Sequence, residues 1–321
     1  MADDIGKYLD GDALALALTS GIHRVLSEQE LLNRINVFPV ADSDTGTNLS
    51  LSLGATLGVL GKPGEKHLGT MLAAVADTLL DGARGNSGAI LAQFFQGMSD
   101  SAGELTRFTT YTFSKAVSLG NEYAHDALSQ PREGTILSVI AAFAESIGHE
   151  VRAVREGHFP AVVSQAMQRV EEALANTPNQ LDVLRKAGVV DAGAKGFAEL
   201  VAGMERYLRD GTIEPLPDTP FAHHDEPAIE FAEADNESRY RYCTECMVTG
   251  EDINRRKLRE ALSELGDSLV LAGTKRKAKI HVHVDNPDEV FEVAARFGEL
   301  GGTKADDMHR QQHSTQDSHR Q

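Results

Sequence analysis

The chain has 321 residues, of which 41% are hydrophobic and 25% charged, as expected of a soluble globular protein with room for two domains. Its formal net charge of −17 opposes binding to nucleic acids and anionic membranes, which are themselves negative. Two cysteines are too few for a disulfide scaffold and favour a reducing, cytoplasmic location. We expect no signal peptide, because Asp3 and Asp4 stand where such a peptide is basic, and no transmembrane segment, because the apolar run at 136–144 is too short.

Hydrophobic residues recur at helical spacing through most of the first 210 residues. The pattern predicts a first helix over 13–26 with Asp12 as its N-cap, and a capping box at Ser27 and Glu30 that begins a short second helix. About eight helices without a convincing strand predict an all-α domain over 1–210. The later helices are expected over 47–60, 68–81, 105–128, 135–154, 161–174 and 194–208.

A turn with two carboxylates lies between the second and third expected helices. Asp42 and Asp44 are two residues apart, so their charges repel one another unless a cation is shared. Carboxylates in a compact turn suit Mg²⁺, which completes its coordination with water and phosphate oxygens. We therefore predict a metal–phosphate site, the alternative being an ordinary turn and N-cap without a ligand. The hydroxyls and backbone N–H groups that would bind the phosphate at the following helix start belong to Thr45, Gly46, Thr47 and Asn48.

A glycine-rich loop separates two of the expected helices. Residues 82–88 contain three glycines, which let backbone N–H groups approach a phosphate, while Asn86 and Ser87 add hydrogen bonds. The alternative is a helix–helix turn with C-cap glycines. The loop is not a P-loop, because the Lys-Ser/Thr ending is missing. Thr135 and Asp191 also lie at expected helix starts, where capping is their ordinary role.

After the helical region the pattern changes twice. Residues 211–237 carry several prolines and acids together with His223 and His224, and we interpret them as a linker with solvated histidines. Residues 238–308 alternate strands and helices and predict a small α/β domain, and 309–321 form a polar tail. The expected strands are 240–248, 268–272 and 279–284, and the expected helices are 254–265 and 288–297.

Two histidines lie on one face of the third expected strand. His281 and His283 share that face because successive side chains of a strand alternate. With Cys243 they could bind Zn²⁺, which prefers nitrogen and sulfur ligands. The alternative is a half-exposed strand whose polar face happens to carry two histidines. Cys246 is either a fourth ligand, an alternate ligand or a buried thiol.

Several segments taken together resemble the ATP-binding subunit of the fatty acid kinase family, which carries a dihydroxyacetone kinase L-subunit-like domain. Ala41, Ser43 and Ala194 depart from its motifs, where the family has a proline and two glycines. Ser43 matters most, because it adds a Cβ between the two carboxylates. The matching segments are 36–48, 82–88, 133–137 and 189–193 in the kinase-like domain, and 242–245 and 281–283 in a middle domain.

The resemblance implies a multi-domain fold, in which an all-α antiparallel helix barrel that binds ATP and Mg²⁺ precedes the small α/β domain. It implies Mg²⁺ ligands in Asn36, Asp42 and Asp44. It also implies a structural Zn²⁺ held by the cysteine and the two histidines singled out above. The implied nucleotide contacts are Thr45, Gly46, Thr47, Asn48, Asn86, Ser87, Gly88, Thr135, Asp191 and Gly193.

The implied reaction is a kinase reaction that serves phospholipid metabolism. The γ-phosphoryl group of ATP passes to the carboxylate of a fatty acid, presented by a separate fatty-acid-binding protein of the DegV type, and an acyl phosphate forms. We assign no general base, because a carboxylate acceptor is already ionised. The alternatives are the phosphotransfer component of a dihydroxyacetone (glycerone) kinase and a non-catalytic nucleotide-binding scaffold. We also expect a homodimer, and a further C-terminal domain of the family that this sequence stops before.

Overall fold

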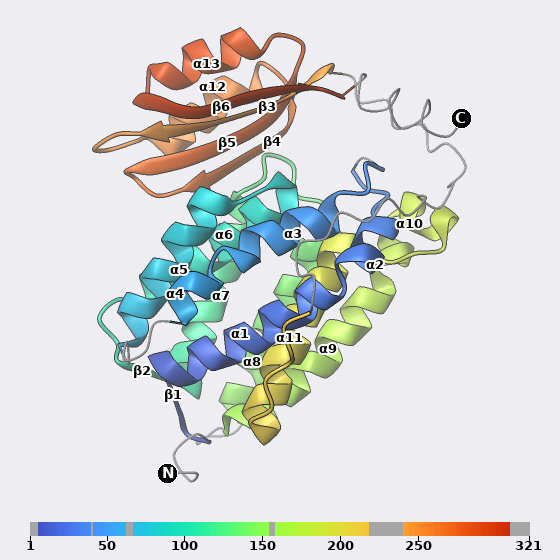
Figure 1. Ribbon diagram of the computed structural model, residues 1–321, viewed down its shortest axis with the longest axis vertical. Helices are drawn as coiled ribbons and strands as arrows, with labels where there is room; N and C mark the ends of the chain where they lie inside the picture. The colour runs from blue at the N-terminus through green and yellow to red at the C-terminus, as the bar shows by residue number, and fades with distance from the viewer. Residues whose placement is uncertain (1–5, 40, 62–66, 154–157, 218–239, 309–321) are drawn as a thin grey trace. The chain divides into compact units, whose positions relative to one another are not determined.

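The computed structural model describes residues 6–39, 41–61, 67–153, 158–217 and 240–308 (Figure 1). The chain divides into two compact units. The first comprises Met1–His125 and Arg132–Ala234, and the second comprises Asp126–Pro131 and Asp235–Gln321.

Helices make up nearly all of the first unit (Figure 1). α11 packs against α1, α8 and α9, and its Phe197 meets the rings of Phe94 and Phe143 edge to face, with centroids 5.6 and 5.8 Å apart. Over the described ranges, no helix is both long and apolar enough to cross a membrane. The helices are α1 (Gly11–Ser27), α2 (Gln29–Arg34), α3 (Thr45–Gly54), α4 (Leu57–Leu60), α5 (Leu68–Gly82), α6 (Gly85–Ala102), α7 (Thr110–Asp126), α8 (Ile136–Ala153), α9 (Phe159–Gln180), α10 (Asp182–Ala187) and α11 (Ala192–Asp210).

The expectation that this unit contains no strand was wrong. β1 (Tyr8–Asp10) pairs antiparallel with β2 (Arg107–Thr109). Three residues are too short to show the alternation that identifies a strand in a sequence. The helix expected to begin at residue 105 begins only at Thr110, as α7, because β2 occupies the residues just before it.

Two expected helix caps were also wrong. Asp10, not Asp12, caps α1, and its carboxylate accepts a hydrogen bond of 2.9 Å from the backbone N–H of Ala13. Ser27 forms no capping box, since its hydroxyl donates to the carbonyl of His23 one turn earlier in α1, at 2.9 Å. α2 then begins at Gln29 without a side-chain cap.

The second unit is a four-stranded antiparallel sheet in the order β4-β5-β3-β6, with two helices. Apolar side chains of α12 and α13, such as Leu258 and Val290, pack with one face of the sheet into a hydrophobic core. Within the same unit, Ser129 donates its N–H to Leu269, and Leu128 forms a bridge with Val270 at the edge of β4. The elements are β3 (Tyr242–Thr249), α12 (Arg255–Ser263), β4 (Asp267–Gly273), β5 (Lys277–Val284), α13 (Pro287–Ala295) and β6 (Glu299–Asp307).

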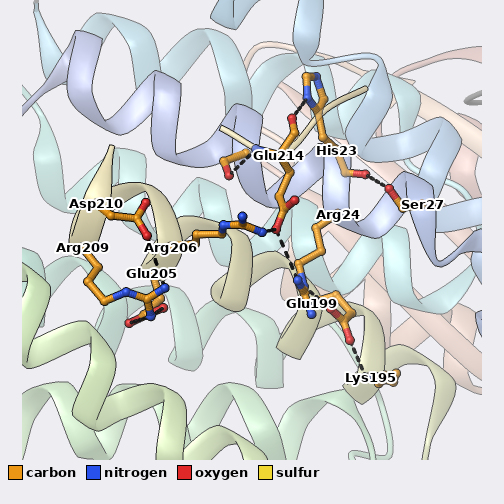
Figure 2. A network of polar contacts seen from close by, with 11 residues as sticks. His23, Arg24, Ser27, Lys195, Glu199, Glu205, Arg206, Arg209, Asp210 and Glu214 are labelled. Atoms are coloured by element: carbon orange, nitrogen blue, oxygen red, sulfur yellow. Dashed lines mark hydrogen bonds and ion pairs between the residues drawn. The ribbon is translucent and has the colours of Figure 1, made fainter. Parts of the chain in front are cut away.

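The first residues of the expected linker are held on the helical unit (Figure 2). The carboxylate of Glu214 pairs with Arg206 at 2.8 Å and Arg24 at 3.3 Å, and its carbonyl lies 2.7 Å from Nδ1 of His23. Residues 211–217 therefore form part of the first unit rather than a free connection. The remaining linker residues, 218–237, lie outside the described residues together with 238–239 and the tail, 309–321, and His223 and His224 are among them.

Neutralising Glu199 is expected to destabilise the first unit by about 2 kcal/mol. Its carboxylate is buried between α1 and α11, where it pairs with Arg24 and Lys195 (Figure 2). An amide would remove the charge that both cations share there, and would leave Arg24 with the longer contact to Glu214. Urea unfolding of Glu199→Gln measures the loss. Glu172→Gln is the matched control, because its ion pair with Arg169 is exposed and should be worth less than about 0.5 kcal/mol. Equal effects of the two substitutions would contradict the prediction.

Candidate functional site

Two carboxylates stand where α3 begins. Asp44 is the N-cap residue, but its side chain makes no capping hydrogen bond within the described part of the chain, and it lies within hydrogen-bonding distance of the Asp42 carboxyl instead. Asp42 accepts a hydrogen bond of 2.6 Å from the buried amide of Asn36. Surrounding protein atoms raise the pKa of Asp42, the charge of Asp44 adds to the rise, and Asn36 opposes it. The Asp42 side chain is nevertheless exposed to solvent, and a shared cation would relieve the repulsion between the two carboxylates.

The residue between the carboxylates adopts a conformation that favours glycine. Ser43 has a φ of 55°, in the left-handed region where a Cβ is crowded by the backbone. The turn is therefore built with the serine in place, at a cost in backbone strain. This accounts for the glycine that the resembled motif has at the same position.

Replacing Ser43 with glycine is expected to stabilise the first unit by about 0.5 to 1 kcal/mol, because glycine removes the strain of the left-handed conformation but adds freedom to the unfolded chain. Urea unfolding without added metal measures the change. Ser43→Ala serves as the control, since alanine keeps the crowded Cβ and should give no gain. A glycine variant less stable than wild type would mean that the serine hydroxyl contributes more than the strain costs.

The glycine-rich loop meets the start of α3. Gly85 has a φ of 59°, and a methyl group on it would lie 2.7 Å from the amide nitrogen of Asn48. The hydroxyl of Ser52 links the two segments, because it donates to the carbonyl of Asn48 at 2.6 Å and accepts from the N–H of Arg84 at 2.9 Å. In the same loop, the side-chain oxygen of Asn86 is buried and, among the described residues, has no hydrogen-bond partner. Such an orphaned polar atom marks a place where a ligand or water can bind.

The starts of α6, α8 and α11 also meet. A methyl group on Gly193 would lie 2.7 Å from the hydroxyl oxygen of Ser87 and 3.4 Å from Cβ of Ile136. The structure therefore brings together residues that are far apart in the sequence, from four of the predicted segments. Helix N-termini carry partial positive charge and unsatisfied N–H groups, so their convergence beside two carboxylates suits a metal ion with an anion bound to it.

Thr135 and Asp191 are engaged as helix caps. The buried carboxylate of Asp191 accepts from the N–H of Ala194 at 2.8 Å, and burial raises its pKa to about 6, against backbone hydrogen bonds from Ala194, Ile136 and Gly193. The hydroxyl of Thr135 accepts from the N–H of Leu137 in the first turn of α8 at 3.4 Å and donates to the carbonyl of Arg132 at 2.7 Å. Both side chains thus hold the helix starts that surround the site, and the nucleotide contacts expected of them stay predictions.

Two polar residues of this site, Ser52 and Asn33, were not singled out in the sequence. Asn33, in α2, makes two hydrogen bonds of 3.0 Å with Thr47 of α3, one to its N–H and one to its hydroxyl. The signal that could have found it is its place three residues before Asn36, one helical turn away. Within a short helix, however, an asparagine is usually read as a surface residue.

The second unit carries a separate cluster of possible metal ligands. The strand register places Cys243 of β3 opposite His283 of β5, and His281 lies on the same face. The sulfur of Cys243 and one imidazole nitrogen of each histidine all lie within 4.8 Å of one another. A carboxylate oxygen of Glu245 lies 3.0 Å from Nδ1 of His281, within hydrogen-bonding distance. A carboxylate oxygen of Asp267 lies 3.9 Å from Nδ1 of His283. Carboxylates behind histidines are a usual feature of zinc sites, so the residues present fit zinc.

Cys246 belongs to the hydrophobic core and not to this cluster. It is 1% exposed, faces α12 and α13 with Val248, and pairs across the sheet with Ile280. Burial raises the pKa of its thiol to about 12, and the charge of Glu245 adds to the rise. Of the three roles expected for Cys246, the buried thiol is therefore correct.

Comparison with known proteins agrees with this architecture. Residues 39–206 match the family described as DAK2 domain, and residues 239–315 match the FakA-like family, described as a middle domain of fatty acid kinase. Protein YloV of Bacillus subtilis is 32% identical over 319 residues, which are 96% of this chain and 57% of that protein. An uncharacterised protein of Staphylococcus saprophyticus is 32% identical over 312 residues, 95% of this chain and 56% of its own.

The chain thus spans little more than half the length of these relatives. The crystal structure of the dihydroxyacetone kinase from C. freundii in complex with AMP-PNP and Mg²⁺ is 15% identical, covers 60% of this chain and 33% of its own, and has a TM-score of 0.46, too low to carry an argument. The family matches, in contrast, extend over most of the described residues, and the first covers more than half of the chain. The chain therefore belongs to the DAK2 domain family, and its second unit is a FakA-like middle domain of the fatty acid kinase type.

Proposed function

We propose that this chain is an ATP-dependent phosphotransferase subunit of the fatty acid kinase type. The observation that carries the proposal is that two neighbouring carboxylates, of which Asp44 caps no backbone N–H within the described residues, stand at the start of α3, and that the starts of further helices meet near it. Such a site offers ligands for Mg²⁺ and N–H groups for the phosphates that Mg²⁺ accompanies. The antiparallel helix barrel implied by the family resemblance is part of the same proposal.

Each group at the site has a role in this proposal. Asp42 and Asp44, supported by Asn36, would hold Mg²⁺, which neutralises charge on the phosphates when it is bound. The start of α3 and the Asn86–Ser87 pair would bind the phosphate chain through N–H groups and side-chain donors. Phosphoryl transfer requires positioning and charge neutralisation more than covalent catalysis, so these residues suffice for the protein's share of the chemistry.

The acceptor that we propose is a fatty-acid carboxylate presented by a separate protein of the DegV type. A carboxylate oxygen forms a bond to the γ-phosphorus while the bond from that phosphorus to the β–γ bridging oxygen breaks, so that acyl phosphate and ADP result. The carboxylate is already ionised and needs no general base. A hydroxyl acceptor such as dihydroxyacetone would need one, and the site residues described above include no free histidine or lysine for that role.

Hydroxylamine trapping tests this proposal, because it converts an acyl phosphate into a hydroxamate that mass spectrometry identifies. The chain is incubated with Mg–ATP and a fatty-acid-loaded DegV-type protein, and in parallel with dihydroxyacetone. Hydroxamate formed only with the loaded protein is the expected result. Phosphorylation of dihydroxyacetone instead would favour the glycerone kinase, and Mg–ATP binding without turnover of either acceptor would favour the nucleotide-binding scaffold.

Two further properties belong to the proposal. We propose a structural Zn²⁺ held by Cys243, His281 and His283 of the middle domain, whose donor set suits that ion. We also propose a homodimer in the cytoplasm. Light scattering coupled to size exclusion should then give twice the 34.6 kDa mass of one chain, and a mass of one chain would contradict the dimer.

A further inference from the structure

The start of α3 is held by one side chain of α2. The amide oxygen of Asn33 accepts the backbone N–H of Thr47 at 3.0 Å, and its amide nitrogen donates to the hydroxyl oxygen of Thr47, also at 3.0 Å. The two helices come unusually close at this point. A methyl group on Gly46 would clash with the carbonyl of Gln29 and lie 2.8 Å from the amide oxygen of Asn33, so glycine at 46 is what lets the amide reach Thr47.

These two hydrogen bonds determine where the hydroxyl proton of Thr47 can be donated. A backbone N–H can only donate, so the oxygen of the Asn33 amide must face the Thr47 N–H and its nitrogen must face the hydroxyl. The hydroxyl oxygen of Thr47 is then an acceptor from Asn33, and its own proton has to be donated elsewhere. Among the described residues, none accepts a hydrogen bond from the Thr47 hydroxyl. Thr47 lies in the first turn of α3, close in sequence to the two carboxylates.

We infer that Asn33 is a positioning residue, which orients the Thr47 hydroxyl as a hydrogen-bond donor to a phosphate of Mg–ATP. The inference rests on the proposed function, since it requires the nucleotide to bind at this site. It also changes the expected role of Thr47. Its backbone N–H is occupied by Asn33, so the threonine contributes its hydroxyl and not its amide to the phosphate.

Substituting aspartate for Asn33 isolates the orienting effect. A carboxylate still accepts the N–H of Thr47, but it cannot donate to the hydroxyl, and it accepts the hydroxyl proton instead. Asn33→Asp should therefore weaken Mg–ATP binding on the order of 10- to 100-fold, the effect of a hydrogen bond to a charged group. Asn33→Ala should lose less, because its Thr47 hydroxyl is free to rotate and still donate. Calorimetry measures the affinities, and thermal unfolding without nucleotide shows whether each variant is folded.

A double-mutant cycle separates orientation from charge repulsion. Thr47→Val removes the hydroxyl and should weaken Mg–ATP binding as Asn33→Asp does, while Thr47→Ser should retain it. If Asn33 acts through Thr47, Asn33→Asp adds little to Thr47→Val. If the new carboxylate merely repels phosphate, or the substitution only loosens the fold, the two losses multiply, and this result would overturn the inference.

The cycle also keeps this inference distinct from the proposed function. A wild-type chain that binds no Mg–ATP would overturn both. A wild-type chain that binds Mg–ATP, together with an Asn33→Asp variant of equal affinity, would overturn the role of Asn33 alone. An Asn33→Ala variant that loses more affinity than Asn33→Asp would do the same, because it would show that the N–H contact and not the hydroxyl orientation matters.

Discussion

A chain in which both Asp42 and Asp44 are replaced by asparagine is expected to lose Mg²⁺-dependent ATP binding by on the order of 100-fold or more, the usual consequence of removing charged partners from a bound ion. The substitution keeps the size of both side chains and removes both charges. The amide of Asn36, which donates to Asp42 at 2.6 Å, would keep an oxygen acceptor in the variant. Calorimetric titration with ATP, with and without Mg²⁺, measures the loss directly.

The same variant should lose no stability in the absence of metal. Without metal, the two neighbouring carboxylates repel one another, so removing both charges should leave the melting temperature unchanged or higher. Added Mg–ATP should stabilise the wild type by about 2.7 kcal/mol at a hundred times its dissociation constant, and should stabilise the variant by less than about 0.5 kcal/mol at the same concentration.

The matched control for this experiment is Glu251→Gln/Asp252→Asn, which neutralises two neighbouring exposed acids of the second unit. It changes the net charge by the same amount and should bind Mg–ATP as the wild type does. Unchanged Mg²⁺-dependent binding in the Asp42→Asn/Asp44→Asn variant would place the metal elsewhere. A comparable loss in the control would assign the effect to net charge.

Long helices and their apolar faces were predictable from the sequence, and short or glycine-rich elements were not. The helix expected over 68–81 is α5, Leu68–Gly82, because leucines recur there at helical spacing. β6 was missed because Gly301 and Gly302 interrupt any alternation of apolar residues. The cap of α1 was expected at Asp12 and is Asp10, because the sequence does not reveal at which residue the helix begins.

The residues of the candidate site could be named one by one from the sequence, but their assembly in space could not. Spacing alone singled out the carboxylates of Asp42 and Asp44 and left a plain turn as the alternative. That Ser87 lies beside Gly193, more than a hundred residues later, follows from packing and has no local signal in the sequence. Only the family resemblance, which the DAK2 and middle-domain matches confirm, assigned these distant segments to one site from the sequence.

Chain purified without added metal is expected to contain about one Zn²⁺, and its two cysteines should react very differently with a thiol reagent. Cys243, half-buried beside the two histidines, should be protected while it binds zinc and should react after chelation. Cys246 should stay unreactive in both states until the protein is unfolded, because it is 1% exposed and burial raises its pKa to about 12. The reagent should thus modify no thiol in the zinc-bound chain, one after chelation and two after unfolding.

Two cysteine variants test which thiol binds the zinc. Cys243→Ser should lose both the zinc and the thiol that chelation exposes, while Cys246→Ala should keep both, at a cost in stability, since it only removes a core side chain. Zinc retained by Cys243→Ser would contradict the site. A loss of zinc from Cys246→Ala, in a chain still folded by circular dichroism, would contradict the orientation of β3, which places the two thiols on opposite faces of the sheet.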